Sequence, residues 1–325
     1  MSSEEQLPYR MYRGLANNGM GIGEGPVAPN IFGEQFFHAG SPLELDSNFL
    51  KAVRYWMTFD WTGSDYAELG EDIEGWSYSN YKQWRFVVRL CAGGEFDRRL
   101  AYFSQAWVWD ENQFSNGFDP GVYIGNHEAF DTPWRNLKNP PTSKSLPPPL
   151  TVRPAQVLAN PQLALNLLAH FYDSLANKPN VPVVLGADMV DFRIGGPLSA
   201  IVSFVRTAIP LHLKRDCRIR ILTHTPSFFL DENTNILVLQ ANDMWHILRY
   251  KPNAILLNRK GLRLSGRAPS DAAVRYAEWM LTCFSKPELQ NLLPACTEQI
   301  SKLWGTAAPS LKQVDTIPDI YKNLL

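Results

Sequence analysis

The sequence predicts a mainly α protein that carries a small β element. Apolar and aromatic residues recur at helical spacing in several segments, as expected for helices that each bury one face. Short β-branched or apolar runs, which are typical of strands, fall mainly between residues 215 and 265. A content of 45% hydrophobic and 19% charged residues is that of a folded chain with a large core.

The first 45 residues are predicted to form an extended N-terminal arm. Four alternating glycines between residues 19 and 25, followed by Pro26 and Pro29, favour neither a helix nor a regular strand. An arm that carries several aromatic side chains should dock on the body of its own chain or on a neighbouring subunit. The aromatic candidates for this assembly contact are Tyr9, Tyr12, Phe32, Phe36 and Phe37.

Residues 46–139 are predicted to form a helical subdomain. A first helix begins near Ser47, a second runs from the candidate N-cap Ser79 to Gly93, and a third runs from Glu95 to Trp107. Residues 140–154 contain most of the tract NPPTSKSLPPPL, which predicts a stiff, polyproline-like linker. A division between subdomains is therefore expected there.

Residues 155–325 are predicted to form a helical domain that contains the β element, at about 215–265. Helices are expected after Asn160, from Gly195 to Ala208, and from Ser270 to Phe284, with another over 294–304. The runs CRIRILTH, NILVLQA and AILLN are bounded by turn residues and predict three strands. Strict alternation in the first run places its arginines on one face of the sheet and its isoleucines on the other.

The cysteines and the apolar segments bear on where the protein resides. The four cysteines form no CxxC pair, and the polar N-terminus shows no secretory signal, so reduced, buried cysteines are expected. No stretch approaches the length of a membrane span, and we expect no membrane partner. These features predict a protein of the cell cytoplasm.

Motifs for metal, cofactor or nucleophilic chemistry are missing from the sequence. The glycines of the arm lack phosphate-loop spacing, and the six histidines never fall at zinc-ligand spacing. An acidic cluster over residues 65–74 lacks the order of a calcium loop, and no GxSxG elbow is present. We therefore predict no catalytic residues, no metal and no cofactor, and a protein that is not an enzyme.

Asp188 and Asp191 form the most enzyme-like feature of the chain. They follow the apolar run VPVVLG, and an acid at the end of a strand is a common position for a catalytic carboxylate. They support the alternative of a hydrolase that acts on a sugar or a nucleotide. The other interpretation of these residues is a helix cap or a partner for Arg193.

Charge is unevenly distributed, although the net charge is only −1. Residues 1–80 hold 12 acids and 4 bases, which gives −8, whereas residues 206–267 hold 11 bases and 4 acids, which gives +7. Arginine and lysine contact phosphates without reading the bases, so the basic segment predicts sequence-independent RNA binding. The candidates for facing RNA are Lys214, Arg215, Arg218 and Arg220 in one group, and Arg259, Lys260, Arg263 and Arg267 in another.

Two alternatives to a dedicated RNA-binding surface remain open. Ordinary solvated surface charge explains the same residues, and a pI near 6.6 is low for a nucleic-acid binder. A nucleoprotein that binds single-stranded RNA, or another interaction module, is the third functional alternative, beside a structural subunit and a hydrolase.

The arm up to Phe37, the aromatic segment FLKAVRYWMTFDW and the segment FDPGVYIGN with the proline tract after it resemble the coat proteins of partitiviruses, of the cryspovirus or plant cryptic virus type. The resemblance implies a helical shell domain with a smaller protruding subdomain. It also implies a subunit that pairs with itself and assembles into an icosahedral shell around double-stranded genomic RNA, found in the virion and in the host cell cytoplasm. The high content of aromatic residues and proline, with 24 prolines, suits such a rigid, interface-rich subunit.

Overall fold

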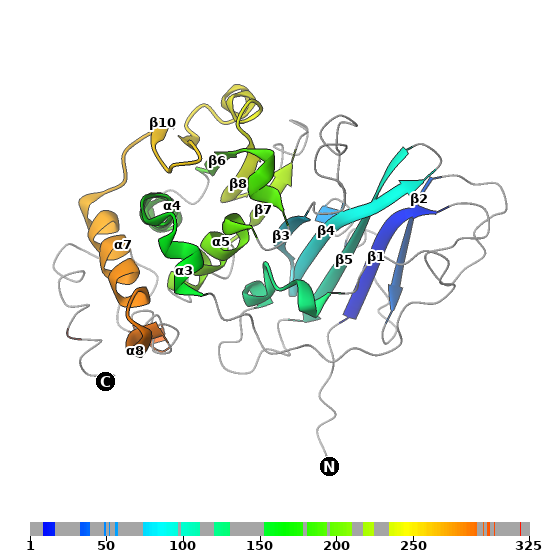
Figure 1. Cartoon of the computed structure of the whole chain (residues 1–325), viewed down its shortest axis with the longest axis horizontal. Coiled ribbons are helices and arrows are strands. Elements are labelled where there is room, and N and C mark those ends of the chain that lie inside the picture. The colour runs from blue at the N-terminus through cyan, green and yellow to red at the C-terminus, as the bar shows by residue number, and fades with distance from the viewer. Residues whose placement is uncertain are drawn as a thin grey trace, which may run out of the picture. The chain divides into compact units, whose positions relative to one another are not determined.

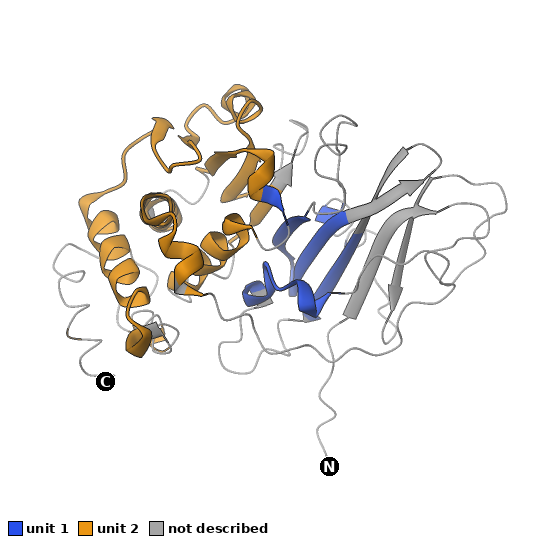
Figure 2. Ribbon diagram, viewed as in Figure 1, with its two compact units in different colours: residues 1–150, 192–194 blue, residues 151–191, 195–325 orange. Residues whose placement is uncertain are grey.

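A computed structural model shows strands and helices along much of the chain (Figure 1). It describes residues 9–16, 33–39, 74–96, 99–110, 120–130, 153–177, 181–193, 196–209, 217–223 and 234–290, together with positions 49, 52, 56–57, 295, 298–299, 302 and 319. The chain divides into two compact units, drawn in Figure 2. Unit 1 comprises residues 1–150 and 192–194, and unit 2 comprises residues 151–191 and 195–325.

Unit 1 contains an antiparallel sheet in the strand order β3-β4-β5-β1-β2. Its strands are β1 (Tyr9–Ala16), β2 (Gly33–Ala39), β3 (Glu74–Tyr81), β4 (Trp84–Phe96) and β5 (Arg99–Asp110). Two short 3-10 helices, η3 (Pro120–Tyr123) and η4 (His127–Ala129), follow the last strand. The indole of Trp107 donates a hydrogen bond of 2.8 Å to the carbonyl of Ala129, which fixes η4 against β5.

Two of the helix predictions for unit 1 are wrong. The segments from Ser79 to Gly93 and from Glu95 to Trp107 form the hairpins of β3, β4 and β5. A two-residue turn with a positive φ at Lys82 joins β3 to β4. Aromatic and β-branched residues fill these strands, and cross-strand packing of such side chains favours a sheet even where helical spacing is also present.

The predicted arm also contains regular structure. Strands β1 and β2 pair with each other, and Tyr12 lies opposite Phe37 in their register. Four of the five aromatic arm candidates thus belong to these two strands, whereas Phe32 lies outside the described residues. The prediction that no regular strand forms in the arm is therefore wrong, because backbone pairing outweighs the glycines and prolines between the strands.

A buried ion pair joins β3 to β4 inside unit 1. The Nε atom of Arg89 lies 3.0 Å from Oε1 of Glu74, and both side chains are almost fully buried. Burial raises the pKa of the Glu74 carboxyl, and the positive charge of Arg89 opposes that rise. Because a buried charge without a partner is costly, each residue requires the other.

Unit 2 is an α/β structure built on four parallel strands. The strand order is β10-β9-β6-β8-β7, in which only β10 runs antiparallel to its neighbour. The strands are β6 (Val183–Ala187), β7 (Ile219–Thr223), β8 (Ile236–Gln240), β9 (Ile255–Leu257) and β10 (Arg263–Ser265). Parallel strands are covered on both faces, which explains why these runs are almost continuously apolar.

Aromatic side chains join three of the helices that the structure describes in unit 2. The described helices of this unit are α3 (Pro154–Leu158), α4 (Pro161–Asn177), α5 (Pro197–Ala208), α7 (Asp271–Phe284) and α8 (Pro287–Gln290). The ring of Tyr172 in α4 stacks on Tyr276 in α7 at 4.3 Å between centroids, and Phe204 in α5 lies 4.4 Å from Phe284. The predicted helices after Asn160, after Gly196 and after Ser270 are confirmed as α4, α5 and α7, as are the three predicted strands.

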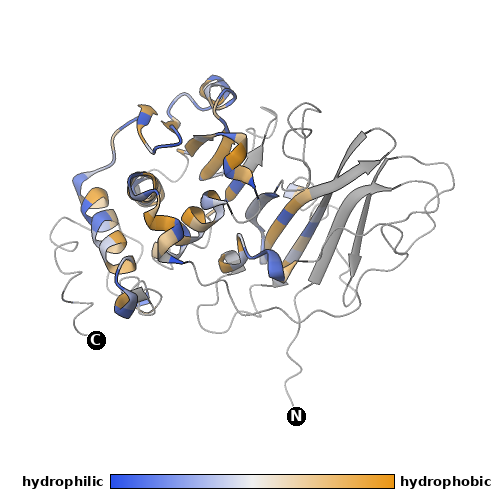
Figure 3. Ribbon diagram, viewed as in Figure 1, coloured by the Kyte–Doolittle hydropathy of each residue, from blue (hydrophilic) through white to orange (hydrophobic). Residues whose placement is uncertain are grey.

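Another part of the unit 2 core lies under a 3-10 helix. Met244 and Ile247 of η7 (Met244–Arg249) pack with Val184, Leu237 and Leu256 of the parallel strands. Figure 3 shows apolar residues along these strands, whereas the connections around η7 and β10 are largely hydrophilic. A second 3-10 helix, η5 (Met189–Phe192), follows β6.

The expected fold class is therefore wrong. The described residues hold ten strands, and each unit is built on a sheet, so the chain is not mainly α with a small β element. The helical shell domain with a smaller protruding subdomain, which the resemblance implies, does not describe this fold. Of the predicted linker over 140–154, only Arg153 and Pro154 lie within the described residues.

Candidate nucleic-acid interface

The connections after β6, β8 and β9 form one edge of unit 2. Because these three strands are parallel neighbours, their carboxyl ends meet at the same edge of the sheet. A hydrogen bond of 3.0 Å from the amide of Ala241 to the carbonyl of Ala187 joins the ends of β8 and β6. In open α/β sheets this edge is where ligands usually bind.

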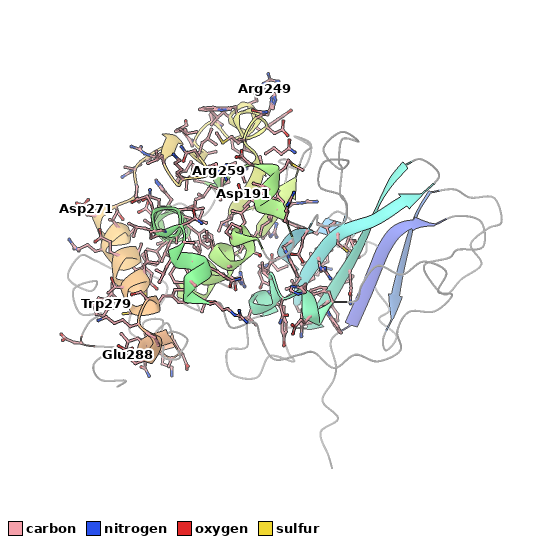
Figure 4. All side chains as sticks on the ribbon, viewed as in Figure 1. Asp191, Arg249, Arg259, Asp271, Trp279 and Glu288 are labelled. Carbon is pink, nitrogen blue, oxygen red and sulfur yellow. The ribbon has the colours of Figure 1, made fainter. Side chains whose placement is uncertain are left out.

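Asp188, Asp191 and Arg259 come together at this edge. Figure 4 labels Asp191 and Arg259. Arg259 forms an ion pair with Asp188, and its Nη2 atom lies 3.5 Å from Oδ1 of Asp191. The second oxygen of Asp191 accepts a hydrogen bond of 3.0 Å from the amide of Asp188. The partner of the two acids is therefore Arg259 and not the Arg193 that sequence proximity suggests.

The three side chains differ in their exposure to solvent. Arg259 is 49% exposed, Asp188 is 47% exposed and Asp191 is 13% exposed. The guanidinium thus lies at the surface between one open and one nearly covered carboxylate. Ion pairs at such exposed positions are weak, so a competing anion can replace a carboxylate at Arg259.

A rigid turn presents Arg259 and Lys260. The side-chain oxygen of Asn258 accepts hydrogen bonds of 2.9 Å from the amides of Lys260 and Leu262. Gly261 has a φ of +79°, and a Cβ atom there would lie 2.7 Å from the backbone of Leu163 in α4. The turn is thereby seated on α4 and holds its two cations outward.

A continuous stretch of the chain around this turn carries only positive charge. Residues 244–267, here called the basic segment, hold six lysines and arginines and no aspartate or glutamate, which gives +6. Its cations are Arg249, Lys251, Arg259, Lys260, Arg263 and Arg267, and all but the half-buried Lys251 are exposed. Figure 4 labels Arg249 on η7 and Arg259 after β9.

The positive charge of the basic segment also reaches a buried histidine. The pKa of His170 in α4 is lowered to about 4, chiefly by burial and then by the positive charge of Arg263, while the negative charge of Asp173 opposes the shift. His170 is therefore neutral at physiological pH. Because its side chain is buried, His170 is not part of the exposed surface of the basic segment.

Exposed apolar side chains accompany the cations. Among the described residues, the large hydrophobic side chains that are exposed are Val190, Trp245, Tyr250, Leu262 and Leu264. All but Val190 belong to the basic segment, and Val190 lies in η5 next to Asp191. Cations and aromatic rings therefore share one stretch of surface-exposed chain.

The structure separates the two groups of predicted RNA-facing residues. Arg259, Lys260, Arg263 and Arg267 are all exposed, whereas Lys214 and Arg215 lie outside the described residues. Arg218 is half-buried, and Arg220 in β7 is only 2% exposed. Arg220 is thus wrong as a surface candidate, because β7 belongs to a sheet that is covered on both faces.

Sequence reasoning missed Arg249, Lys251, Trp245 and Tyr250. The signal that could have found them is the absence of any acid between residues 244 and 267, which the count over the wider window 206–267 concealed. Three or more His, Cys, Asp or Glu side chains placed to hold a metal ion are not found within the part of the chain that the structure describes. None of the described helices is both long and apolar enough to cross a membrane.

Comparison of the sequence with protein-family models and with curated proteins finds no match. The case for a function therefore rests on the geometry and charge of the basic segment.

Proposed function

We propose that this chain is an RNA-binding structural subunit that contacts the RNA backbone with its basic segment. The observation that carries the proposal is the exposed, acid-free run of cations over residues 244–267. Phosphates repeat along every RNA, so surface cations bind them without regard to sequence. A neutral total charge does not oppose this, because the acids are concentrated in residues 1–80.

The kind of structural subunit that we propose is the coat protein that the partitivirus resemblance implies. Such a subunit pairs with copies of itself and forms a closed shell around genomic RNA, in the virion and in the host cytoplasm. The support for this part is the sequence profile together with the basic segment. A coat subunit needs one face for RNA and others for its neighbours, and aromatic side chains commonly anchor the latter.

Titration of RNA binding against salt tests the proposal. A variant in which Arg259, Lys260, Arg263 and Arg267 are all changed to Gln should bind labelled RNA more weakly than the wild type. Each lost phosphate contact should also reduce the slope of log affinity against log salt by about 0.7 to 0.9. A matched control changes Arg153, Arg193, Lys286 and Lys302 to Gln, which removes the same charge from exposed positions outside the basic segment.

The comparison of the two variants decides the outcome. The control should retain nearly the wild-type affinity and slope, because its cations lie outside the binding surface. Equal losses in both variants would mean that the total charge, and not the basic segment, governs binding. An unchanged affinity in the basic-segment variant would contradict the proposal directly.

A second candidate function is hydrolysis of a nucleotide or a sugar, which the position of Asp188 and Asp191 after β6 favours. Both carboxylates contact Arg259, so a substrate would have to displace that contact before either acted as an acid or a base. Incubation with RNA and with nucleoside triphosphates, followed by chromatography of the products, tests this candidate. Turnover that is lost in the double variant Asp188→Asn, Asp191→Asn would support it.

A further inference from the structure

Trp245 and Tyr250 are exposed on a segment whose position the core fixes. Met244 and Ile247 of η7 are buried against the parallel strands, together with Ala254 before β9. Trp245 in η7 is 48% exposed, and Tyr250, which directly follows η7, is 47% exposed. Two aromatic rings are thus displayed on an anchored element.

Cations lie close to these rings in the sequence. Arg249 and Lys251 flank Tyr250, and Arg249 follows Trp245 by four residues. The basic segment holds four arginines against two lysines. A planar guanidinium both contacts phosphate and stacks on a base, whereas an ammonium acts only as a point charge.

We infer that the basic segment takes single-stranded RNA, with Trp245 and Tyr250 stacking on unpaired bases while the neighbouring cations contact the phosphates. The inference rests on the proposed RNA-binding function and names the class of RNA. Aromatic platforms combined with a positive surface are the usual means of binding single strands without sequence preference. The partitivirus resemblance implies double-stranded genomic RNA instead, so a preference for single strands would count against that part of the coat proposal and leave RNA binding by the basic segment standing.

A duplex offers these rings little to bind. Paired bases are stacked inside the helix, so a duplex presents mainly phosphates and 2′-hydroxyls to a protein surface. Exposed rings on a duplex-binding face would gain no stacking partner. Unpaired bases expose their flat aromatic faces, on which a protein side chain can stack. Because every base has such a face, stacking of this kind does not depend on the RNA sequence.

Fluorescence anisotropy with labelled RNA of two forms tests the inference. The full chain is titrated against an oligouridine and against a duplex of the same length, at one fixed salt concentration. We expect the wild type to bind the oligouridine more tightly. Trp245→Ala and Tyr250→Ala should each weaken oligouridine binding by about tenfold and leave duplex binding unchanged.

Two further variants separate stacking from loss of apolar surface. Trp245→Phe retains an aromatic ring and should restore most of the lost affinity. Val190→Ala removes an exposed apolar side chain of η5, outside the basic segment, and should leave both affinities unchanged. Circular dichroism of each variant confirms that it is folded.

Each outcome bears on a different claim. Equal affinity for the two RNA forms, with no selective loss in the Trp245 and Tyr250 variants, would overturn the inference and leave the proposed RNA binding standing. Failure of the wild type to bind either RNA would overturn the proposed function itself. Loss of binding to anionic phospholipid vesicles in Trp245→Ala, with RNA binding intact, would show a membrane surface and would also overturn the inference.

Discussion

Arg259 is the cation whose surroundings define the candidate site. Asp188 and Asp191 contact its guanidinium, so a phosphate that binds there must compete with two carboxylates. Lys260 is the next residue in the same turn and is also exposed. The two neighbours should therefore contribute differently to RNA affinity, with part of the contribution of Arg259 suppressed by the acids.

Changing Asp188→Asn should increase RNA affinity. The substitution removes a carboxylate that competes with phosphate for Arg259 and leaves a side chain of nearly the same shape. Because Asp188 and Arg259 are both about half exposed, we expect an increase of only about two- to fivefold. Anisotropy titration with oligouridine measures it.

The control for this prediction is Glu278→Gln, which removes one negative charge from the exposed face of α7. It should change RNA affinity little. The effect of Asp188→Asn should also disappear when Arg259 is already changed to Gln. An increase that persists without Arg259 would show that the acid acts on the general field and not on this arginine.

His170 predicts a pH dependence of the stability of unit 2. Its pKa is lowered to about 4 in the folded chain, chiefly by burial and then by Arg263, whereas an unfolded histidine titrates near its ordinary value of 6.5. Between these values the unfolded chain binds more protons than the folded one. The free energy of unfolding should therefore fall as pH decreases from about 6.5 to about 4, by up to about 3 kcal/mol from this group.

Urea unfolding at a series of pH values between 7.5 and 4.5 tests this expectation. His170→Gln should flatten the acid-side loss of stability, and His127→Gln, at an exposed position in unit 1, should not. Identical pH profiles for the wild type and His170→Gln would contradict the assignment.

At the scale of the element, the turn between β9 and β10 depends on its glycine. Gly261 has a positive φ and lies against the backbone of Leu163, and its carbonyl accepts a hydrogen bond of 2.9 Å from the side chain of Asn166 in α4. A Cβ atom at this position would force the turn away from α4. The geometry that holds Arg259 and Lys260 outward would then be lost.

Gly261→Ala should consequently lower the free energy of unfolding by about 1–3 kcal/mol. It should also weaken RNA binding, because the turn that carries two of the cations is displaced. Lys260→Ala, in the same turn, should weaken RNA binding without a measurable loss of stability. Thermal unfolding followed by circular dichroism, together with anisotropy, separates the two effects, and a fully stable Gly261→Ala would contradict the packing described here.

The elements of unit 2 could be predicted from the sequence, whereas those of unit 1 could not. Proline at the first helical position identifies α4 and α5, and the short apolar runs identify β6 to β9 only as strands, without their parallel order. In unit 1 the run from Trp84 to Leu90 has apolar residues at helical spacing, and it is also rich in the aromatic and β-branched residues that are typical of strands. Long-range pairing with β3 and β5 decides between the two, and a single sequence does not contain that pairing.

At the scale of the whole molecule, the candidate site joins residues that the sequence suggested for two different functions. Asp188 and Asp191 were candidates for an enzyme, and Arg259 was a candidate for RNA binding. They meet because β6 and β9 are parallel neighbours, although 68 or more positions separate them in the chain. The burial of Arg220 likewise depends on the tertiary structure. The alternation of side chains along β7 predicts which face Arg220 is on, but it does not reveal that both faces of the sheet are covered.

The coat proposal predicts self-association of the purified chain. Size-exclusion chromatography and negative-stain microscopy over a range of salt and protein concentrations should show dimers and closed particles. Strands β1 and β2 contain most of the aromatic arm candidates. A truncated chain that begins at residue 46 lacks both strands and should therefore assemble less. A monomer that persists under every condition would remove the coat proposal and leave RNA binding as a separate question.

The central claim is that RNA lies on the basic segment, and ultraviolet crosslinking followed by mass spectrometry tests it most directly. The full chain is bound to oligouridine, irradiated and digested, and the crosslinked peptides are identified. We predict crosslinks within residues 244–267, centred on Trp245 and Tyr250, that high salt removes. Crosslinks confined to unit 1, or none in the basic segment under conditions where RNA is bound, would contradict the claim.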